Sequence, residues 1–170
     1  GQFVLSPNSK GQVLAYERAF KSADVSPDKI DYVECHATGT PLGDKVELNS
    51  MEQFFTSKDQ AGSNKPLIGS VKSNLGHMLT NAGMGGMIKV ILSLQQGKIP
   101  ATIGVQNAMT SKDNGISADM VVTETTAWPH KNKERKAGVS AFGFGGTNAH
   151  LLIENKSSKK AGKSSKKGKN

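Results

Sequence analysis

The sequence contains a single cysteine among its 170 residues, and this scarcity excludes an internal disulfide framework. A lone thiol is compatible with a reducing compartment, so we expect a cytoplasmic protein. No apolar run approaches the roughly 18 to 20 residues that a membrane-spanning helix requires, and no signal-peptide pattern is present. The chain starts at Gly1 rather than at a methionine, and we expect it to be a piece of a longer protein.

Glycine patterns that bind nucleotide phosphates are missing as well. No GxxxxGK[ST] loop and no GxGxxG turn occurs, and the glycine-rich run "AGMGGMIKV" follows a loop rather than a strand. No Cys/His cluster has the spacing of a metal site, which leaves the irregularly spaced set His36, His77 and Asp44 as a metal alternative. We therefore expect no metal, no nucleotide and no other bound cofactor.

Acidic residues are absent from the last part of the chain, where positive charge accumulates. The formal net charge is +8, but residues 155–170 contain seven lysines and no acid. Residues 1–154 hold fifteen basic and fourteen acidic residues, so this body is nearly neutral. We expect one globular domain over 1–154 and a disordered Lys/Ser/Gly-rich linker over 155–170. The alternative is a module that binds nucleic acid through the linker in a salt-dependent way. The neutral body favours a protein with neither nucleic-acid nor membrane partners.

Hydrophobic periodicity predicts helices that alternate with strands. Apolar residues recur at helical spacing in three segments, 12–23, 44–55 and 82–96. Five segments have the alternating, β-branched or aromatic composition of strands: 31–36, 65–71, 120–128, 136–144 and 148–154. This order predicts an α/β layered domain with crossover helices.

Two of the predicted helices have further features. Asp44 is a candidate N-cap of the helix 44–55, and Glu47 three residues later suits a capping box. In the helix 82–96, Val90 and Leu94 lie on a different face from the main apolar stripe, so we expect burial on more than one side. The glycines at the start of this helix would weaken it in isolation and predict close packing against another backbone.

Three segments combine polar residues with glycine-rich backbone: "HATGTPLGD" at 36–44, "KSNLGH" at 72–77 and "GFGGTNAH" at 143–150. The first two follow predicted strands, and ligand sites in α/β sheets lie at the carboxyl ends of strands. His36 and His77 could therefore converge and donate hydrogen bonds to a developing oxyanion. The alternative is that each histidine caps its own loop and bonds a carbonyl group.

Cys35 precedes His36 directly on a predicted strand. Adjacent strand residues point to opposite faces, so the two side chains cannot easily enter one cavity. Free cysteine is common in protein cores, and we interpret Cys35 as a structural residue rather than a nucleophile. We interpret His130 and His150 as structural as well.

Together the three motifs resemble those of the β-ketoacyl synthases, the condensing enzymes of fatty-acid and polyketide synthesis. "VECHATGTPLGD" followed by Glu47 resembles the first histidine motif of that family, and "GSVKSNLGH" resembles its lysine and second-histidine motif. "GVSAFGFGGTNAHLLIE" resembles the glycine-rich closing segment, and the three occur in family order from Val33 to Glu154. "GDKVELNSMEQFF" is similar to synthases of the polyunsaturated-fatty-acid type. Thiolases are less similar, because they place a second catalytic cysteine in the closing segment.

The resemblance implies a thiolase-like fold, in which two α/β halves form an αβαβα sandwich. The nucleophilic cysteine of that family lies in the first half, in a motif like "ACSS" that this sequence lacks. The chain therefore resembles the C-terminal half of a ketosynthase from a multidomain enzyme, and we expect it to be inactive alone. Expected partners are the N-terminal half with the catalytic cysteine, an acyl carrier protein, and a second ketosynthase subunit in a homodimer or heterodimer. Half a sandwich should also expose an apolar face.

The activity implied is that of an acyltransferase, a decarboxylative Claisen condensation of acyl and malonyl thioesters carried on phosphopantetheine. His36 and His77 would donate hydrogen bonds to the malonyl thioester oxygen, and Lys72 would orient and support the pair. Thr38 and Thr40 would hydrogen-bond the pantetheine arm. The alternative is a non-catalytic subunit like a chain-length factor, which shapes the acyl tunnel; both histidines and Lys72 argue against it.

The remaining motif residues would support or gate this site. Asp44 and Glu47 would brace the loop and the start of the helix. Phe144 would contribute a backbone N–H to the oxyanion hole and gate the acyl chain. Three glycines would give this loop its conformational freedom: Gly143, Gly145 and Gly146.

Overall fold

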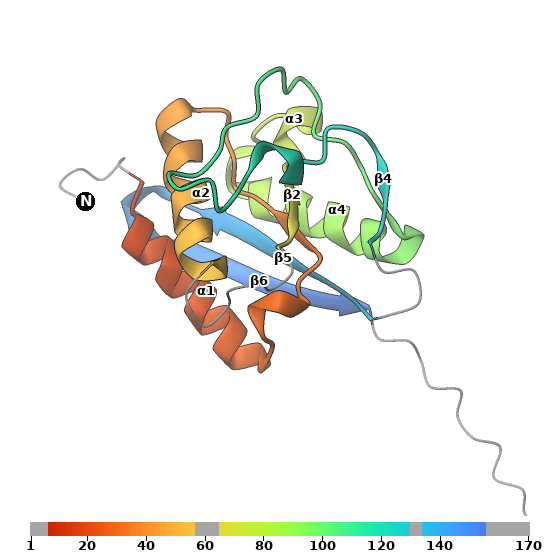
Figure 1. Ribbon diagram of the computed structural model, residues 1–170, viewed down its shortest axis with the longest axis horizontal. Helices are drawn as coiled ribbons and strands as arrows, with labels where there is room; N and C mark the ends of the chain where they lie inside the picture. The colour runs from red at the N-terminus through yellow and green to blue at the C-terminus, as the bar shows by residue number, and fades with distance from the viewer. Residues whose placement is uncertain (1–6, 57–64, 130–133, 156–170) are drawn as a thin grey trace, which may run out of the picture.

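The computed structural model describes residues 7–56, 65–129 and 134–155, without the side chain of Phe144 (Figure 1). The expectations for His130 and for the Phe144 side chain lie outside these residues, as does the predicted linker 155–170 apart from Asn155. Asn155 is the last residue of a strand and pairs with Arg135, so the prediction that the linker starts at 155 was wrong. The central feature is a four-stranded sheet in the order β2-β1-β5-β6. Its strands are β1 (Tyr32–Glu34), β2 (Leu67–Gly69), β5 (Arg135–Phe142) and β6 (Asn148–Asn155).

Strand β1 lies inside the sheet and pairs in parallel with both β2 and β5, whereas β5 and β6 form an antiparallel hairpin. Val121 forms an isolated parallel bridge with Ile68 of β2. A second, smaller sheet joins β3 (Lys98–Ile99) to β4 (Thr126–Ala127). Because β1 and β2 are parallel neighbours, their carboxyl ends lie at the same edge of the sheet.

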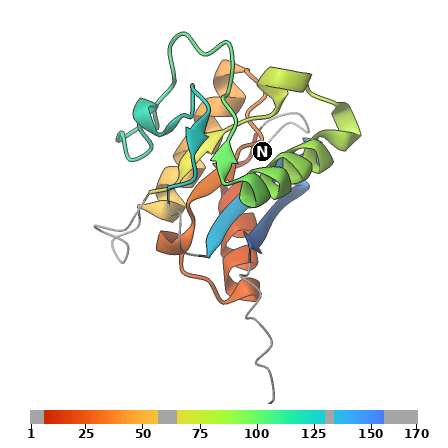
Figure 2. The same ribbon diagram turned by 90° about the vertical axis from the view of Figure 1, so that its right-hand side faces the viewer.

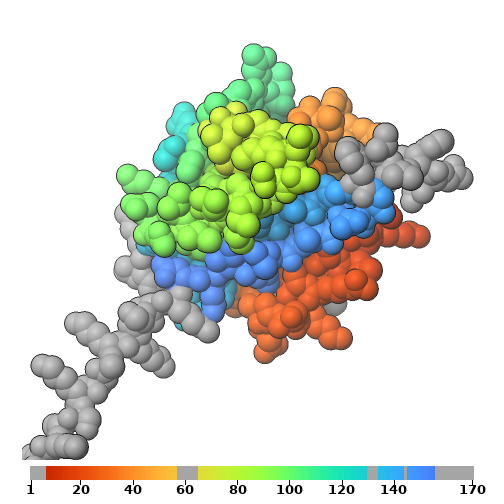
Figure 3. Space-filling model, turned by 180° about the vertical axis from the view of Figure 1, so that it is seen from behind, coloured from red at the N-terminus to blue at the C-terminus, as the bar shows by residue number. Residues whose placement is uncertain are grey.

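Helices cover both faces of the sheet. The helices α1 (Ser9–Ala23) and α2 (Pro41–Phe55) pack on each other, and α4 (Ala82–Gln96) packs on β5 and β6. Figure 3 shows β6, in blue, running between the green α4 and the red-orange α1. Two core clusters result, and alternation divides β1 and the residue after it between them: Val33 and Cys35 belong to one cluster and Tyr32 to the other. The α/β layered prediction is confirmed.

The predicted start of α2 was wrong. Asp44 is not the N-cap, because the helix begins at Pro41 with Thr40 in the N-cap position and no side-chain cap. Proline is favoured in the first turn of a helix, since its fixed φ suits the helix and it has no N–H that needs a partner. The capping box between Asp44 and Glu47 is therefore absent, and both carboxylates bond the preceding loop instead.

The prediction of a continuous β segment over 120–128 was also wrong. Val122 pairs with Ile68 on one side and with Thr102 on the other, whereas Thr126 pairs with Ile99 of β3. The segment is divided between two partners, so the residues between them turn instead of extending one strand (Figure 2). Sequence periodicity also missed the short helix α3 (Lys72–Leu75) in the second motif.

Helix α4 has the predicted bounds and packs closely on the sheet. A Cβ added at Gly86 would lie 3.0 Å from the Cγ of Glu34 and 3.4 Å from a methyl group of Val139. The expected close packing is present, although the partners are side chains of the sheet rather than another backbone. Neither α4 nor any other helix within the described ranges has the length and apolar character needed to cross a membrane.

Candidate active site

The first two motifs meet at the carboxyl ends of β1 and β2. His36 lies just beyond β1, and the segment from Lys72 to His77 follows β2. The imidazole ring centroids of His36 and His77 are 5.7 Å apart, and the ring planes are nearly perpendicular, at 85°. His36 is partly exposed and His77 is exposed. The structure therefore brings together two histidines from different strand–loop units, in a position open to a ligand.

The Glu47 carboxylate fixes the backbone of the first motif. Its two oxygens accept hydrogen bonds from the backbone N–H groups of His36 and Ala37, each at 2.8 Å. One turn earlier in α2, the Asp44 carboxylate accepts the N–H of Thr38 at 3.0 Å. Burial raises the pKa of the Glu47 carboxyl to about 7 and also raises the pKa of Asp44. These two carboxylates brace the loop that carries His36.

The electrostatic surroundings keep His36 neutral. Burial lowers the pKa of its imidazole from the ordinary value of 6.5 to about 4, and the electrostatic effects of Lys72 and His77 act in the same direction. A neutral imidazole carries one N–H donor, which suits hydrogen bonding to an oxyanion. The buried Nδ1 of His36 has no hydrogen-bond partner in the described part of the chain.

Lys72 is the cation that links the two histidine motifs electrostatically. Burial lowers the pKa of its ammonium group, while the carboxylates of Glu34 and Glu47 favour the charged form. The Lys72 charge in turn disfavours protonation of His36. Lys72 is thus placed to favour the neutral form of His36.

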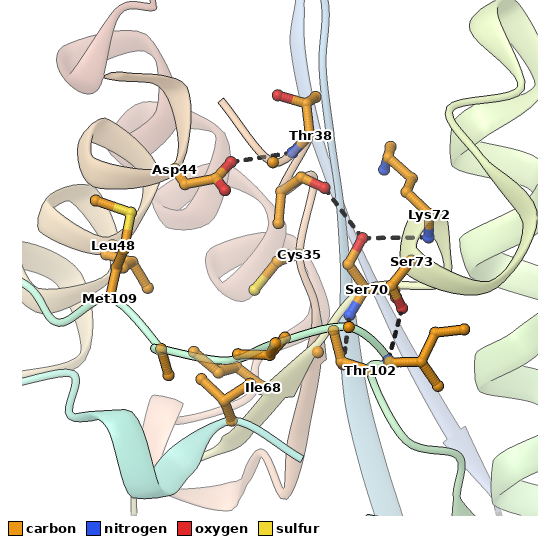
Figure 4. Close-up of a pocket in the computed structure, with 18 of the residues that line it drawn as sticks. Cys35, Thr38, Asp44, Leu48, Ile68, Ser70, Lys72, Ser73, Thr102 and Met109 are labelled. Atoms are coloured by element: carbon orange, nitrogen blue, oxygen red, sulfur yellow. Dashed lines mark hydrogen bonds between the residues drawn. The ribbon is translucent and has the colours of Figure 1, made fainter. Parts of the chain in front are cut away.

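A cavity of about 460 Å³ lies beside this site and reaches Cys35 (Figure 4). Its apolar lining includes Leu48, Ile68 and Met109, and its polar lining includes Thr38 and Lys72. Figure 4 shows the Cys35 sulfur directed toward the cavity. His36 does not line it, as expected from the opposite orientation of adjacent residues at the end of a strand.

Three polar side chains of α2 bond the segment that directly follows the cavity-lining residues 102–109. The sequence interpretation did not single them out. The Lys45 ammonium donates to the carbonyl of Thr110 at 2.8 Å. Asn49 accepts the N–H of Lys112 at 2.8 Å, and Glu52 accepts the Ser111 hydroxyl at 2.6 Å. The three occupy positions i, i+4 and i+7, so the available signal was a polar stripe on one helix face.

Cys35 has the structural role predicted from its position. It is buried, belongs to the core cluster beside α1 and α2, and its Sγ lies 3.8 Å from the Sδ of Met51. Burial raises the pKa of the thiol well above its ordinary value, and the carboxylates of Glu47 and Glu34 add to this effect. A raised pKa favours the protonated thiol, which is a weaker nucleophile than the thiolate.

The third motif begins with the turn between β5 and β6, and the residue just before it, Phe142, approaches His36. The ring of Phe142, the last residue of β5, lies 5.9 Å from the ring of His36. The N–H of Gly143 closes the turn by donating to the carbonyl of Thr147 at 2.8 Å. Gly145 and Gly146 have positive φ angles of 74° and 83°, which non-glycine residues rarely adopt. Sequence reasoning did not single out Phe142.

The two threonines of the first motif face each other, with 3.0 Å between the Oγ1 atoms of Thr38 and Thr40.

His150, on β6, lies in an aromatic cluster with Tyr16 and Phe20. Its Nδ1 is 3.1 Å from the hydroxyl of Ser140, and burial lowers the pKa of its imidazole to about 3. These contacts are those of a structural histidine.

Residues 7–56, 65–129 and 134–155 contain no group of three or more His, Cys, Asp or Glu side chains placed to hold a metal ion. Asp44, the third member of the metal alternative, bonds the N–H of Thr38.

Comparisons with known proteins are consistent with this arrangement. Residues 1–106 match the family model "Beta-ketoacyl synthase, C-terminal domain", and residues 119–170 match "Ketoacyl-synthetase C-terminal extension". A phenolphthiocerol/phthiocerol polyketide synthase of Mycobacterium tuberculosis is 40% identical over 151 residues, which are 89% of this chain and 7% of that protein. The 6-methylsalicylic acid synthase of Penicillium expansum is 39% identical over 156 residues, 89% of this chain and 8% of that protein.

Solved structures of ketosynthases are also similar to this chain. The PfaC keto synthase–chain length factor matches with a TM-score of 0.85 and 57% identity, over 92% of this chain and 16% of that chain. Ketosynthase twelve of the bacillaene polyketide synthase from Bacillus amyloliquefaciens matches with a TM-score of 0.78 and 34% identity, over 91% of this chain and 27% of that chain. The chain spans a minor part of each of these relatives.

Proposed function

This chain belongs to the family of β-ketoacyl synthase C-terminal domains, with the thiolase-like fold of ketosynthases, and we propose that it supplies the histidine half of a condensing active site. The full reaction is a decarboxylative Claisen condensation of acyl and malonyl thioesters. The observation that carries this proposal is the pair His36 and His77, with ring centroids 5.7 Å apart beside the Lys72 cation.

In the proposed mechanism the malonyl thioester oxygen accepts hydrogen bonds from His36 and His77. The bond between the α-carbon and the carboxylate breaks, carbon dioxide leaves, and the electron pair forms an enolate stabilised by the two donors. The enolate carbon then attacks an acyl thioester on the nucleophilic cysteine of the other half, and that thiolate is released. Lys72 favours the neutral, donating form of His36, and Glu47 holds the His36 backbone in place.

The same proposal gives the carrier arm and the closing loop their roles. Thr38 and Thr40 bond the phosphopantetheine of an acyl carrier protein, and the proximity of their hydroxyls supports a shared contact. The backbone N–H of Phe144 contributes to the oxyanion hole, and its side chain gates the acyl chain. The turn geometry of Gly143 and the positive φ angles of Gly145 and Gly146 support a loop shaped for close approach.

The partner in this proposal is an N-terminal ketosynthase half that carries the nucleophilic cysteine. Four large apolar side chains on the outer face of α4 are between 37% and 53% exposed: Met84, Ile88, Ile91 and Leu92. Figure 3 shows α4, in green, beside β6, in blue. An apolar surface of this kind on one helix is typical of a site that another protein surface covers. We further propose a cytoplasmic enzyme that forms a homodimer or heterodimer. Its assignment to the polyunsaturated-fatty-acid type is supported by the resemblance of "GDKVELNSMEQFF".

The test uses the complete synthase that contains this chain, with malonyl thioester on an acyl carrier protein. His36→Ala and His77→Ala should each lower the rate of carbon dioxide release by about 10²- to 10³-fold, the usual cost of losing one oxyanion donor. Acylation of the nucleophilic cysteine should persist, and Glu17→Ala, an exposed change on α1, serves as the control. Decarboxylation at the parent rate in both histidine variants would rule out the mechanism.

A second candidate is a subunit that shapes the acyl tunnel without performing chemistry. The similarity to the PfaC keto synthase–chain length factor favours it, because that name covers both activities. The two candidates differ in what His36→Ala changes. A tunnel-shaping subunit would keep the condensation rate and alter the length of the product, whereas the catalytic role predicts loss of condensation.

A further inference from the structure

A buried ion pair lies between α4 and the sheet, outside the histidine site. The ammonium of Lys89, on α4, is 2.9 Å from Oε2 of Glu34 on β1, and their side chains are 6% and 1% exposed. The hydroxyl of Tyr32 accepts a hydrogen bond from Lys89 at 2.9 Å and donates one to the same Glu34 oxygen at 2.7 Å. The three groups therefore form a closed network in which Oε2 of Glu34 has two partners.

The other oxygen of Glu34 reaches the second motif. Oε1 accepts the backbone N–H of Val71, which is buried and directly precedes Lys72. Glu34 itself lies two residues before His36 on the same strand–loop unit. One carboxylate thus links the backbone that carries His36 to the segment that carries Lys72 and His77, and Lys89 links both to α4.

Stability alone does not account for this network. Replacing a buried ion pair by apolar side chains of similar volume is often neutral or stabilising, because two charges no longer need to be desolvated. An apolar pair could not accept the Val71 N–H, however, and a buried donor without an acceptor is costly. The specific contribution of the pair is therefore a directed acceptor at the start of the second motif.

We propose that Glu34 and Lys89 are positioning residues for the histidine pair. Glu34 holds the segment Val71–His77 at the distance from His36 that double hydrogen bonding to the thioester oxygen requires, and Lys89 and Tyr32 hold the Glu34 carboxylate. This inference rests on the proposed condensing function and extends it to residues that touch neither substrate nor histidine.

The test compares two double variants of the complete synthase. Glu34→Met with Lys89→Met removes both charges and the acceptor for Val71. Glu34→Gln with Lys89→Met removes both charges but keeps an amide oxygen for the Val71 N–H and an amide N–H for the Tyr32 hydroxyl. Thermal unfolding midpoints are measured first, and malonyl decarboxylation is then assayed below the lowest midpoint, with kcat and KM determined separately.

The methionine pair should lower kcat for decarboxylation about 10- to 100-fold, the cost of a misplacement on the scale of 1 Å. Its KM should stay near that of the parent, and the glutamine–methionine pair should recover most of kcat. A folded methionine pair with the parent kcat would overturn the inference. If the methionine pair does not fold, the glutamine–methionine pair decides the question. A kcat near that of the parent supports the inference, and a folded glutamine–methionine pair with a tenfold lower kcat overturns it.

Decarboxylation rates of the parent enzyme and of His36→Ala distinguish a failure of the positioning role from a failure of the proposed condensing function. A parent that releases no carbon dioxide from the malonyl thioester refutes the condensing function itself. A parent that is active and depends on His36, together with an equally active methionine pair, refutes only the positioning role of Glu34 and Lys89.

Discussion

The imidazole rings of His36 and His77 lie 5.7 Å apart at an angle of 85°, although they belong to different strand–loop units. The carboxyl ends of two adjacent parallel strands bring them together, and Lys72 on the second unit favours the neutral form of His36 on the first. This relationship makes the charge state of His36 sensitive to Lys72, a residue that need not touch the substrate.

Burial is the main cause of the lowered pKa of His36, and the positive charge of Lys72 lowers that pKa further. Lys72→Met removes only the second effect and should raise the pKa of His36 above its parent value of about 4. The donating, neutral form of His36 exists above its pKa. In the parent synthase decarboxylation should therefore persist until the pH falls through about 4, and in the variant the acid limb should move to higher pH. NMR titration of the His36 ring in the chain checks the shift directly. Lys65→Met, an exposed change, should leave both titrations unaltered.

His150 should make folding sensitive to acid. Its pKa is about 3 in the folded protein, below the ordinary 6.5 expected after unfolding, so the unfolded chain binds the extra proton between these values. Its stabilising contribution is complete above pH 6.5 and is lost as the pH falls toward 3. The slope for one proton is at most about 1.4 kcal/mol per pH unit.

His150→Phe keeps an aromatic ring beside Tyr16 and Phe20 but cannot be protonated. Urea denaturation of both proteins from pH 7 to pH 4 should show a shallower loss of unfolding free energy in the variant. Equal pH dependence in the two proteins would contradict the assignment of a buried neutral imidazole.

Cys35 should react with thiol reagents only when the chain unfolds, because its sulfur is buried against Met51 and its thiol has a raised pKa. Neither condensation nor acylation at Cys35 is expected of the isolated chain. In the complete synthase, Cys35→Ala should leave condensation intact while lowering the unfolding free energy by about 1–2 kcal/mol. Rapid stoichiometric labelling of Cys35 by cerulenin in the native chain would argue for a nucleophile.

The outer face of α4 should make the isolated chain self-associate or unfold readily. Ile88→Glu places a charge in the middle of this face, where the parent side chain is 50% exposed, and should reduce self-association in sedimentation experiments. The same change should weaken assembly with the N-terminal half. Leu14→Glu on α1, where the side chain is 42% exposed, is the matched control on another face. A parent chain that stays monomeric and stable at high concentration would refute the half-domain interpretation.

The sequence by itself determined the features that depend on local pattern. Apolar spacing predicted the bounds of α4, alternation along β1 placed Cys35 and His36 on opposite sides, and strand–loop order predicted that the two histidine motifs share an edge. Local pattern was less reliable where two signals competed. Asp44 had the chemistry of an N-cap, but Pro41 started the helix three residues earlier.

Only the tertiary structure decided which distant groups meet. The bond from Val71 to Glu34, the ion pair with Lys89 and the approach of Phe142 to His36 each join elements far apart in the chain. Periodicity reports which face of a helix or strand is apolar, but it does not report which side chain of another element lies opposite. The charge state of His36 also depends on burial and on Lys72, and both follow from packing rather than from spacing along the sequence.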